Sequence, residues 1–278
     1  MKKHFEYISE KQIFRLLLSG SDKLLIETRN TNTKEVSFNC FELISGKQIL
    51  CDLQLEEKTW LGVEAIYKDI IFFHKFPKPN MPGHKEIIAF DIAEKKITWQ
   101  NKEYAFAFVY EGKVYCYTQG FEERFFYALD YLTGEVKEDI GSNYALINSL
   151  RTQAENAKDW SPYAFPKSNV AYADESSQKI ITQFTAAFSL VGQIEWIVKN
   201  NILLFTFHTK EKNEKFTNRF AAISTINGEA SLFETLNENV MALLTDSFFV
   251  YKEYLFLLKG KNEVLIYWLT QEQHLGLD

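Results

Sequence analysis

A strand–turn–strand pattern that recurs along the chain constrains its fold more than any other feature. In the clearest copy, residues 87–99, an alternating apolar run ends at Asp91, a short polar corner follows, and a second apolar run ends at Trp99. The same pattern covers residues 40–50, 127–136 and 222–230. These copies place a glycine at the corner, namely Gly46, Gly134 and Gly228. Glycine readily adopts the positive φ that hairpin corners need, so the pattern predicts consecutive antiparallel hairpins.

Two of the corners begin with an aspartate, Asp91 in residues 87–99 and Asp130 in residues 127–136. A carboxylate at the end of a strand can accept hydrogen bonds from the amides of the turn that follows. We therefore interpret both aspartates as structural turn caps.

The copies recur at intervals of about 40–50 residues, the length of one four-stranded propeller blade. A longer gap before residues 222–230 leaves room for a weaker copy, for which residues 171–180 are the candidate, and residues 264–269 resemble a further copy. These intervals predict an all-β fold. We expect a single β-propeller domain over residues 1–278 with six four-stranded blades, five or seven blades being the alternatives.

Residues 87–99 and 127–136 resemble the repeat of the pyrroloquinoline-quinone-type β-propellers. The shared features are an apolar strand containing alanine, an aspartate at its end, a polar corner, and an apolar strand that starts after lysine or glutamate. This family contains quinoprotein dehydrogenases and non-enzymatic scaffolds, so the resemblance implies the fold and leaves the activity open. Its quinone-dependent members carry a ring of tryptophans and, in many, a vicinal disulfide. This chain has five tryptophans and no Cys-Cys pair, so we expect no quinone and no other cofactor.

Charge and composition narrow the functional classes. The 31 basic and 37 acidic residues are interspersed, with a net charge of −6 and no polybasic block, which argues against nucleic acid as a partner. No apolar run approaches a membrane span, and residues 1–7 lack the apolar region of a signal peptide. We expect a monomeric cytoplasmic protein that does not bind membranes. Cys40, Cys51 and Cys116 lie in strand-like runs without metal-ligand spacing, which predicts buried reduced thiols.

Apolar alternation places the expected strands along the chain. The first blade uses Ile13–Leu18, Lys23–Thr28, Val36–Leu43 and Gln48–Leu53, and later blades cover residues 60–99, 105–139, 168–188, 193–233 and 240 onward. The last blade lacks a fourth strand, which residues 4–10 or 274–277 are expected to supply. Apolar residues recur at helical spacing in residues 143–159, which predicts a short helical insertion there.

The sequence contains no nucleophile elbow, Walker-type loop, dinucleotide fingerprint or His-x-x-x-His pair. His74 and His208 end equivalent second strands, but blades two and five of six would hold them too far apart to share a metal, so no metal site is expected. An alternative function remains open, because propeller enzymes assemble their sites from several blades. It is a hydrolase or lyase with a site in the central channel, built from Glu27, His74, Thr118 and His208.

Two irregular segments interrupt the repeat, residues 76–84 and 143–166, and together they hold all five prolines. Loops on a rigid scaffold are where binding residues gather, and in a propeller both segments would emerge on the same face. The predicted binding residues are Phe76, Lys78, Met81, His84, Trp160, Tyr163 and Phe165. An apolar surface with a basic border favours a non-catalytic scaffold that binds a protein or peptide.

Overall fold

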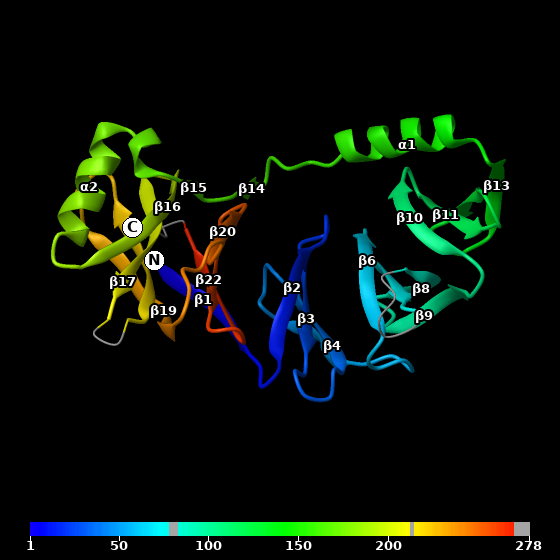
Figure 1. Cartoon of the computed structure of the whole chain (residues 1–278), viewed down its shortest axis with the longest axis horizontal. Helices are drawn as coiled ribbons and strands as arrows, with labels where there is room; N and C mark the ends of the chain where they lie inside the picture. The colour runs from blue at the N-terminus through cyan, green and yellow to red at the C-terminus, as the bar shows by residue number, and fades with distance from the viewer. Residues whose placement is uncertain (78–82, 212–213, 270–278) are drawn as a thin grey trace, which may run out of the picture. The chain divides into compact units, whose positions relative to one another are not determined.

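The computed structural model describes residues 1–77, 83–211 and 214–269. Contacts divide the chain into two compact units, residues 10–158 (the 10–158 unit) and residues 1–9 with 159–278 (the 159–278 unit). Strands dominate both units, as predicted, and each unit has its own sheets (Figure 1). None of the helices in the described part of the chain is long and apolar enough to cross a membrane. The single-domain organisation stays a prediction.

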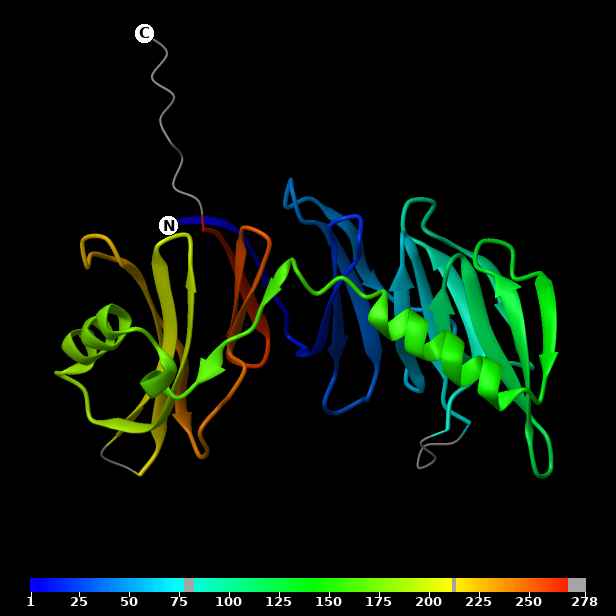
Figure 2. The ribbon, with the colours of Figure 1, turned by 90° about the horizontal axis from the view of Figure 1, so that it is seen from above.

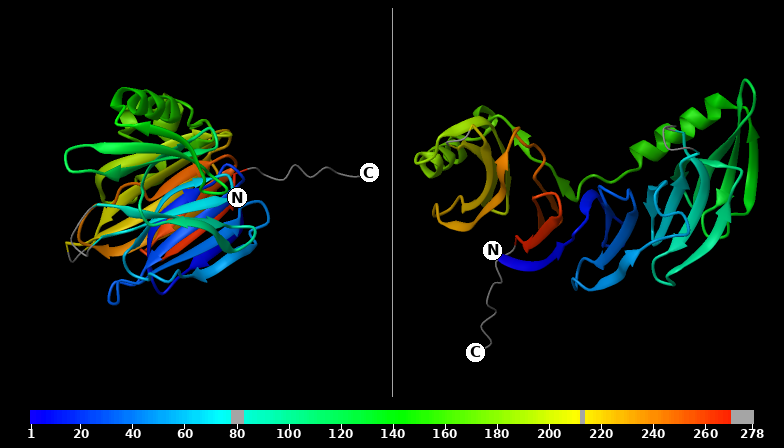
Figure 3. Two further views of the ribbon diagram at one scale, coloured as in Figure 1. Left: turned by 90° about the vertical axis from the view of Figure 1, so that its right-hand side faces the viewer. Right: turned by 60° about the horizontal axis from the view of Figure 1, so that its bottom comes forward.

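The 10–158 unit consists of three four-stranded antiparallel meanders, in which each strand pairs with the next. The first sheet holds β2 (Gln12–Leu18), β3 (Lys23–Arg29), β4 (Val36–Glu42) and β5 (Gln48–Leu53). The second holds β6 (Leu61–Tyr67), β7 (Ile70–Lys75), β8 (Lys85–Asp91) and β9 (Lys96–Asn101). The third holds β10 (Ala105–Tyr110), β11 (Lys113–Gln119), β12 (Arg124–Asp130) and β13 (Val136–Gly141). These strands confirm the first three predicted hairpin groups, and the three sheets lie side by side (Figure 3, right).

Helix α1 (Tyr144–Asn156) confirms the predicted helical insertion. The side chain of Asn143 caps it by accepting a hydrogen bond of 3.0 Å from the amide of Leu146. Ile147 on the buried face of α1 packs in one core with Phe108 of β10. The helix therefore covers the third sheet of its own unit, alongside which it runs in Figure 2.

The 159–278 unit contains two antiparallel sheets. One holds β16 (Leu190–Lys199), β17 (Ile202–Lys210), β18 (Phe216–Ser224) and β19 (Ala230–Val240), with β15 (Lys167–Ser168) at its edge. The other holds β20 (Phe248–Tyr251), β21 (Tyr254–Lys259) and β22 (Glu263–Trp268), with β14 (Tyr163–Ala164) at one edge and β1 (Lys2–Ile8) at the other. Because β1 pairs with β22, the N-terminal strand supplies the missing strand, as predicted. The alternative donor, residues 274–277, lies outside the described residues.

The prediction of strands across residues 168–188 is wrong. Apart from the end of β15, this segment forms the 3-10 turn η1 (Val170–Tyr172) and helix α2 (Glu175–Thr185). Asp174 caps α2, with its Oδ1 accepting a hydrogen bond of 2.9 Å from the amide of Ser177. Ile181 then packs in the core of the β15–β19 sheet. The described residues consequently form five sheets, where six blades were predicted.

The hairpin corners have the predicted geometry. Gly46, Gly134 and Gly228 adopt φ of 70°, 72° and 73°. Oδ1 of Asp91 accepts hydrogen bonds of 2.8 and 2.9 Å from the next turn's amides, and Oδ1 of Asp130 accepts two of 3.0 Å. Both aspartates are turn caps, which confirms their structural interpretation.

Neighbouring sheets within each unit share hydrophobic cores. In the 10–158 unit, the rings of Phe38 and Phe73 join the first and second sheets at 4.8 Å, and Phe72 and Phe106 join the second and third at 5.9 Å. In the 159–278 unit, Phe220 of β18 meets Phe248 of β20 at 5.3 Å. Each sheet thus buries a face against its neighbour.

Whether each cysteine is buried depends on which face of its sheet it occupies. Cys40 and Cys116 are buried, and burial raises the pKa of each thiol to about 12, which keeps them protonated. Cys51 is exposed on the edge strand β5, so the prediction that it is buried is wrong. Successive side chains of a strand point to opposite faces, and its neighbour Leu50 occupies the buried one.

Candidate functional site

Three of the predicted binding residues lie together in the 159–278 unit. The ring of Tyr163 lies 5.5 Å from that of Trp160 and 5.8 Å from that of Phe165, to which it is nearly parallel. Phe165 in turn lies 6.2 Å from Phe249 of β20. Trp160 and Phe165 are 58% and 57% exposed. We call Trp160, Tyr163, Phe165 and Phe249 the aromatic surface.

A short edge strand holds the aromatic surface in place. Strand β14 pairs with β20, which sets the ring of Tyr163 at 4.8 Å from that of Tyr251. The carbonyl of Pro162 extends this pairing by accepting a hydrogen bond of 2.7 Å from the amide of Lys252. Pro162 and Pro166 have no amide hydrogen to donate, so the pairing stays short and the flanking rings stay outside the ladder.

The remaining predicted binding residues belong to the loop after β7 in the 10–158 unit. Phe76 packs edge-to-face on His74 at 4.7 Å and on His84 at 5.3 Å. Lys78 and Met81 lie outside the described residues. Since Phe76 and His84 belong to the 10–158 unit and Trp160, Tyr163 and Phe165 to the 159–278 unit, the combination of these residues into one surface stays a prediction.

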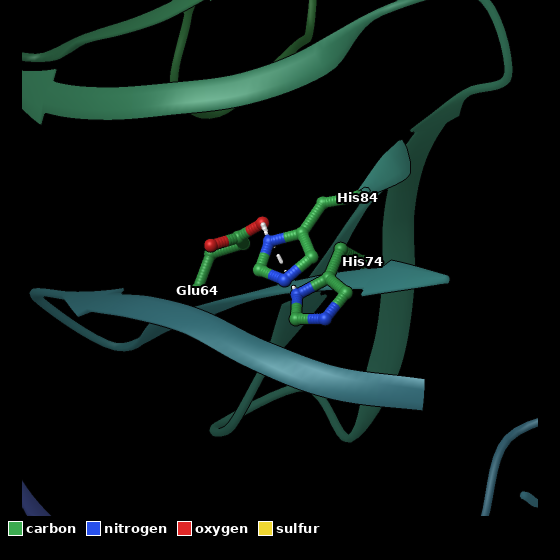
Figure 4. A group of neighbouring side chains, drawn as sticks. All are labelled: Glu64, His74 and His84. Carbon is green, nitrogen blue, oxygen red and sulfur yellow. Dashed lines mark hydrogen bonds and ion pairs between the residues drawn. The ribbon is translucent and has the colours of Figure 1, made fainter. Parts of the chain in front are cut away.

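Glu64, His74 and His84 converge in the second sheet and form what we call the Glu–His–His cluster (Figure 4). Oε1 of Glu64 lies 2.7 Å from Nδ1 of His84 and 3.1 Å from Nδ1 of His74. The two imidazole rings are stacked, with centroids 3.6 Å apart and planes 7° from parallel. One ligand atom from each residue lies within 4.8 Å of the others. Two imidazoles and a carboxylate can hold a proton or a metal ion.

Two irregularities of the sheet bring these side chains together. The β6–β7 register shifts between Val63 and Ala65, which makes Glu64 the extra residue of a β-bulge. The pairing of β7 with β8, along the other edge of β7, also shifts its register at His74. The extra residue lies on β8 near Glu86, whose φ is 64°. A bulge changes the direction in which nearby side chains project. In a regular strand Glu64 would already share the face of Gly62 and of its cross-strand partner His74, whereas His84 would lie on the opposite face. The shift near Glu86 is therefore what brings His84 to the cluster.

The environment of Glu64 favours its ionised form. Burial of the carboxyl raises its pKa, but the adjacent imidazoles of His74 and His84 outweigh that effect and hold the pKa below its usual value of 4.5. The side chain of Glu64 is 13% exposed and that of His74 is 4% exposed, whereas that of His84 is 38% exposed. The cluster therefore has a buried side at His74 and a solvent-facing side at His84.

Sequence reasoning singled out His74 and His84 but missed Glu64 and the contact between the histidines. It compared His74 with His208, which ends the equivalent strand of another sheet. The glycine at position 62 was a signal in the sequence. Gly62 pairs with His74 across the hairpin, and a side chain there would collide with the imidazole ring. The bulge at Glu64 has no comparable signature.

Two residues of the alternative enzymatic site, Glu27 and His208, have structural partners. Oε1 of Glu27, which is fully buried, accepts hydrogen bonds of 2.9 and 2.7 Å from Arg29. Nε2 of His208 lies 3.0 Å from Nδ2 of Asn218 and accepts a hydrogen bond of 3.0 Å from the amide of Leu244. Thr118 lies in β11 of the 10–158 unit, whereas His208 belongs to the 159–278 unit. Their combination into one site is untested.

Comparisons with known proteins give limited information. A family described as "Domain of unknown function (DUF4905)" matches residues 18–99. No curated protein matches the chain.

Several solved structures resemble the chain at low TM-scores. Hsv2p of Kluyveromyces lactis is 9% identical, with 94% of this chain and 76% of that chain covered and a TM-score of 0.28. The uncharacterised protein lmo1340 of Listeria monocytogenes EGD-e is 10% identical, with 96% and 97% covered and a TM-score of 0.33. The β-propeller domain of the Trilobed protease from Pyrococcus furiosus is 11% identical, with 98% and 71% covered and a TM-score of 0.31. At these scores the similarities carry no argument about function.

Proposed function

We propose that the chain is a non-catalytic scaffold that binds a protein or peptide, and that the aromatic surface is its contact region. The observation that supports this function is the exposure of Trp160 and Phe165 beside the stacked ring of Tyr163. Large exposed aromatic side chains are enriched at the centres of interfaces, where they bury much area at little entropic cost. A cluster of them on a sheet edge suits a short apolar or proline-containing segment better than a small polar substrate.

The finer architecture belongs to the same proposal. The sheets are the blades of one β-propeller of the quinoprotein-like repeat type, and the molecule is a cytoplasmic monomer without an organic cofactor. Support comes from the repeated four-stranded meander and from the cores that consecutive sheets share within each unit. A propeller provides a rigid base for loops that bind partners.

The enzymatic alternative has less support. Glu27 is neutralised by Arg29, and the ring nitrogen Nε2 of His208 already accepts hydrogen bonds. A general base must lie within reach of a substrate proton, whereas Glu27 and His208 are both buried. The scaffold function therefore accounts better for the described residues.

A displayed peptide library tests the scaffold function. The full chain is immobilised, and peptides that it enriches are measured by calorimetry against the parent protein and the double variant Trp160→Ser/Phe165→Ser. We expect the double variant to lose at least about tenfold in affinity, which corresponds to about 1.4 kcal/mol.

Tyr172→Ser is the matched control, because Tyr172 is an 80% exposed aromatic residue of the same unit outside the aromatic surface. It is expected to bind like the parent. Thermal unfolding checks that all variants are folded. Failure to enrich any peptide, or an equal loss of affinity in the control, would contradict the proposal.

A further inference from the structure

We propose that the Glu–His–His cluster is a binding site for a divalent transition-metal ion, with zinc as the best match. The ligands are one carboxylate oxygen of Glu64 and one ring nitrogen each of His74 and His84. This site lies in the 10–158 unit and is independent of the aromatic surface.

The spacing of the ligand atoms fits an ion. In a tetrahedral zinc site with bonds of about 2.0–2.1 Å, neighbouring ligand atoms are about 3.3–3.4 Å apart. Here Nδ1 of His74 is 3.1 Å from Oε1 of Glu64, and Nδ1 of His84 is 2.7 Å from the same oxygen. Admission of an ion requires these contacts to lengthen by about 0.2–0.7 Å and one imidazole to turn out of the stack, because the lone pair that binds the ion lies in the plane of its ring. His84, the most exposed ligand, has the freedom to do so.

The buried histidine points independently to a ligand. His74 is only 3% exposed, yet neither of its ring nitrogens makes a hydrogen bond. Its Nδ1 is close to Glu64 without hydrogen-bond geometry. Buried polar atoms are almost always hydrogen-bonded, since an unpaired one costs about 1–3 kcal/mol. Coordination of a metal ion would satisfy one of these nitrogens.

Gly62 leaves room for the ring of His74. A Cβ added at Gly62 would lie 2.7 Å from Cε1 and 2.9 Å from Nε2 of His74. The absence of a side chain therefore creates the space that the imidazole occupies. Phe76 packs on the same ring and restricts it further. The buried ligand is thus pre-organised by packing rather than by hydrogen bonds.

The neighbouring sheets show that the fold does not require these residue types. Each sheet of the 10–158 unit has a bulge in its first strand, at Phe14, Glu64 and Ala107. In the first sheet, the position equivalent to His74 is Arg29, whose guanidinium lies 3.9 Å from the ring centroid of Phe14. In the third sheet it is Tyr117. The same backbone site therefore accepts a cation–π pair or an aromatic residue, and the Glu–His–His set is specific to the second sheet.

The donor set selects the class of metal. Imidazole nitrogen suits zinc, iron, nickel and copper, whereas calcium and magnesium prefer oxygen ligands only. Three protein ligands leave at least one position open on a zinc ion. The exposure of His84 places that position toward solvent, where water or an anionic group of a partner can bind.

Zinc binding by the purified full chain tests the site. Protein freed of metal with a chelator is titrated with zinc sulfate in competition with a chromophoric chelator, and cobalt(II) substitution supplies a visible absorption spectrum. We expect one zinc per chain, no competition by magnesium or calcium, and an affinity about 100-fold or more lower in His84→Ala and in Glu64→Gln, since even outer-shell changes cost about 10–100-fold.

His84→Ala is the decisive variant, because His84 is partly exposed and its loss leaves the core intact. His4→Gln is the matched control, since His4 lies in the other unit, and it is expected to bind zinc like the parent. Circular dichroism checks that each variant is folded. Absence of stoichiometric zinc binding, or unchanged affinity and cobalt spectrum in folded His84→Ala, would overturn the proposal.

Discussion

The indole nitrogen Nε1 of Trp99 donates a hydrogen bond of 3.0 Å to the carbonyl oxygen of Tyr131. Trp99 is on the last strand of the second sheet, and Tyr131 opens the last corner of the third. The ring also packs 6.0 Å from that of Phe72, in the core that these sheets share. This pair therefore joins two neighbouring repeats.

Replacement of Trp99 by alanine should destabilise the 10–158 unit. We expect a loss of about 3 kcal/mol, the lower end of the range for large aromatic side chains because Trp99 is only partly buried. Trp99→Phe keeps most of the packing and removes the hydrogen bond, so its cost should be about 1 kcal/mol. Chemical denaturation measures both, and equal stabilities of the parent and Trp99→Ala would show that the indole contributes nothing to the contact between sheets.

A methyl group at Gly134 should be more harmful than one at another left-handed glycine of the same unit. Gly134 has φ of 72°, and a Cβ there would lie 2.6 Å from Cδ2 of Trp99. Gly141 has φ of 61° and nothing within 4 Å. Gly141→Ala should therefore cost about 1 kcal/mol for backbone strain alone, and Gly134→Ala clearly more. Equal unfolding free energies for the two variants would mean that the indole moves aside without cost.

The buried carboxylate of Glu27 depends on Arg29. Arg29→Ala would leave this charge without its hydrogen-bonded partner, with only Arg15 at 3.9 Å, and should cost about 3 kcal/mol. The double variant Glu27→Gln/Arg29→Ala removes the charge as well and should recover part of the loss. Denaturation curves of the parent, single and double variants check this, and a double variant less stable than Arg29→Ala would contradict it.

His208 should make the stability of the 159–278 unit depend on pH. Burial lowers the pKa of His208 below its usual value of 6.5, so the unfolded chain takes up a proton there at higher pH than the folded protein. The stability that neutral His208 contributes is fully present above about pH 6.5 and is lost as the pH falls through the lower folded-state pKa.

The variant His208→Gln can still accept the hydrogen bond from the amide of Leu244 but cannot be protonated in this range. We expect its unfolding midpoint to fall less than that of the parent between about pH 7.5 and 5.5. Urea titrations at several pH values measure this difference. If the unfolding midpoints of the parent and the variant changed with pH in parallel, His208 would not be the cause of the pH dependence.

Local sequence determines the hairpins well and the helix–strand choice less well. Alternating apolar residues and positive-φ glycines act within a few residues, so the strands around Gly46 and Gly134 were predicted closely. Residues 171–180 were misjudged because Asp174 fits two roles. An aspartate carboxylate accepts amide hydrogen bonds equally at a hairpin corner, as Asp91 does, and at a helix N-terminus. The packing of Ile181 on the neighbouring sheet decides between them, and that contact is not local.

The two candidate sites also differ in how far local sequence predicts them. Trp160, Tyr163 and Phe165 are close in sequence, so their association in one cluster could be predicted, whereas the recruitment of Phe249 depends on sheet pairing. The Glu–His–His cluster depends on the register shift between β7 and β8 near Glu86, which brings His84 to the face of His74. A shift of one residue moves side chains between faces, and the sequence alone does not specify where it occurs.

The pairing of β1 with β22 has a consequence for biosynthesis. The carbonyl of Ser9 accepts a hydrogen bond of 2.8 Å from Asn262, so partners far apart in the chain meet in one sheet. The ribosome makes β1 and the entire 10–158 unit before it makes β22. Until then the edge of β1 that pairs with β22 is uncovered, and Lys2 and Lys3 supply charges that oppose its pairing with other chains. A nascent chain that stops before β22 therefore keeps this edge of β1 uncovered.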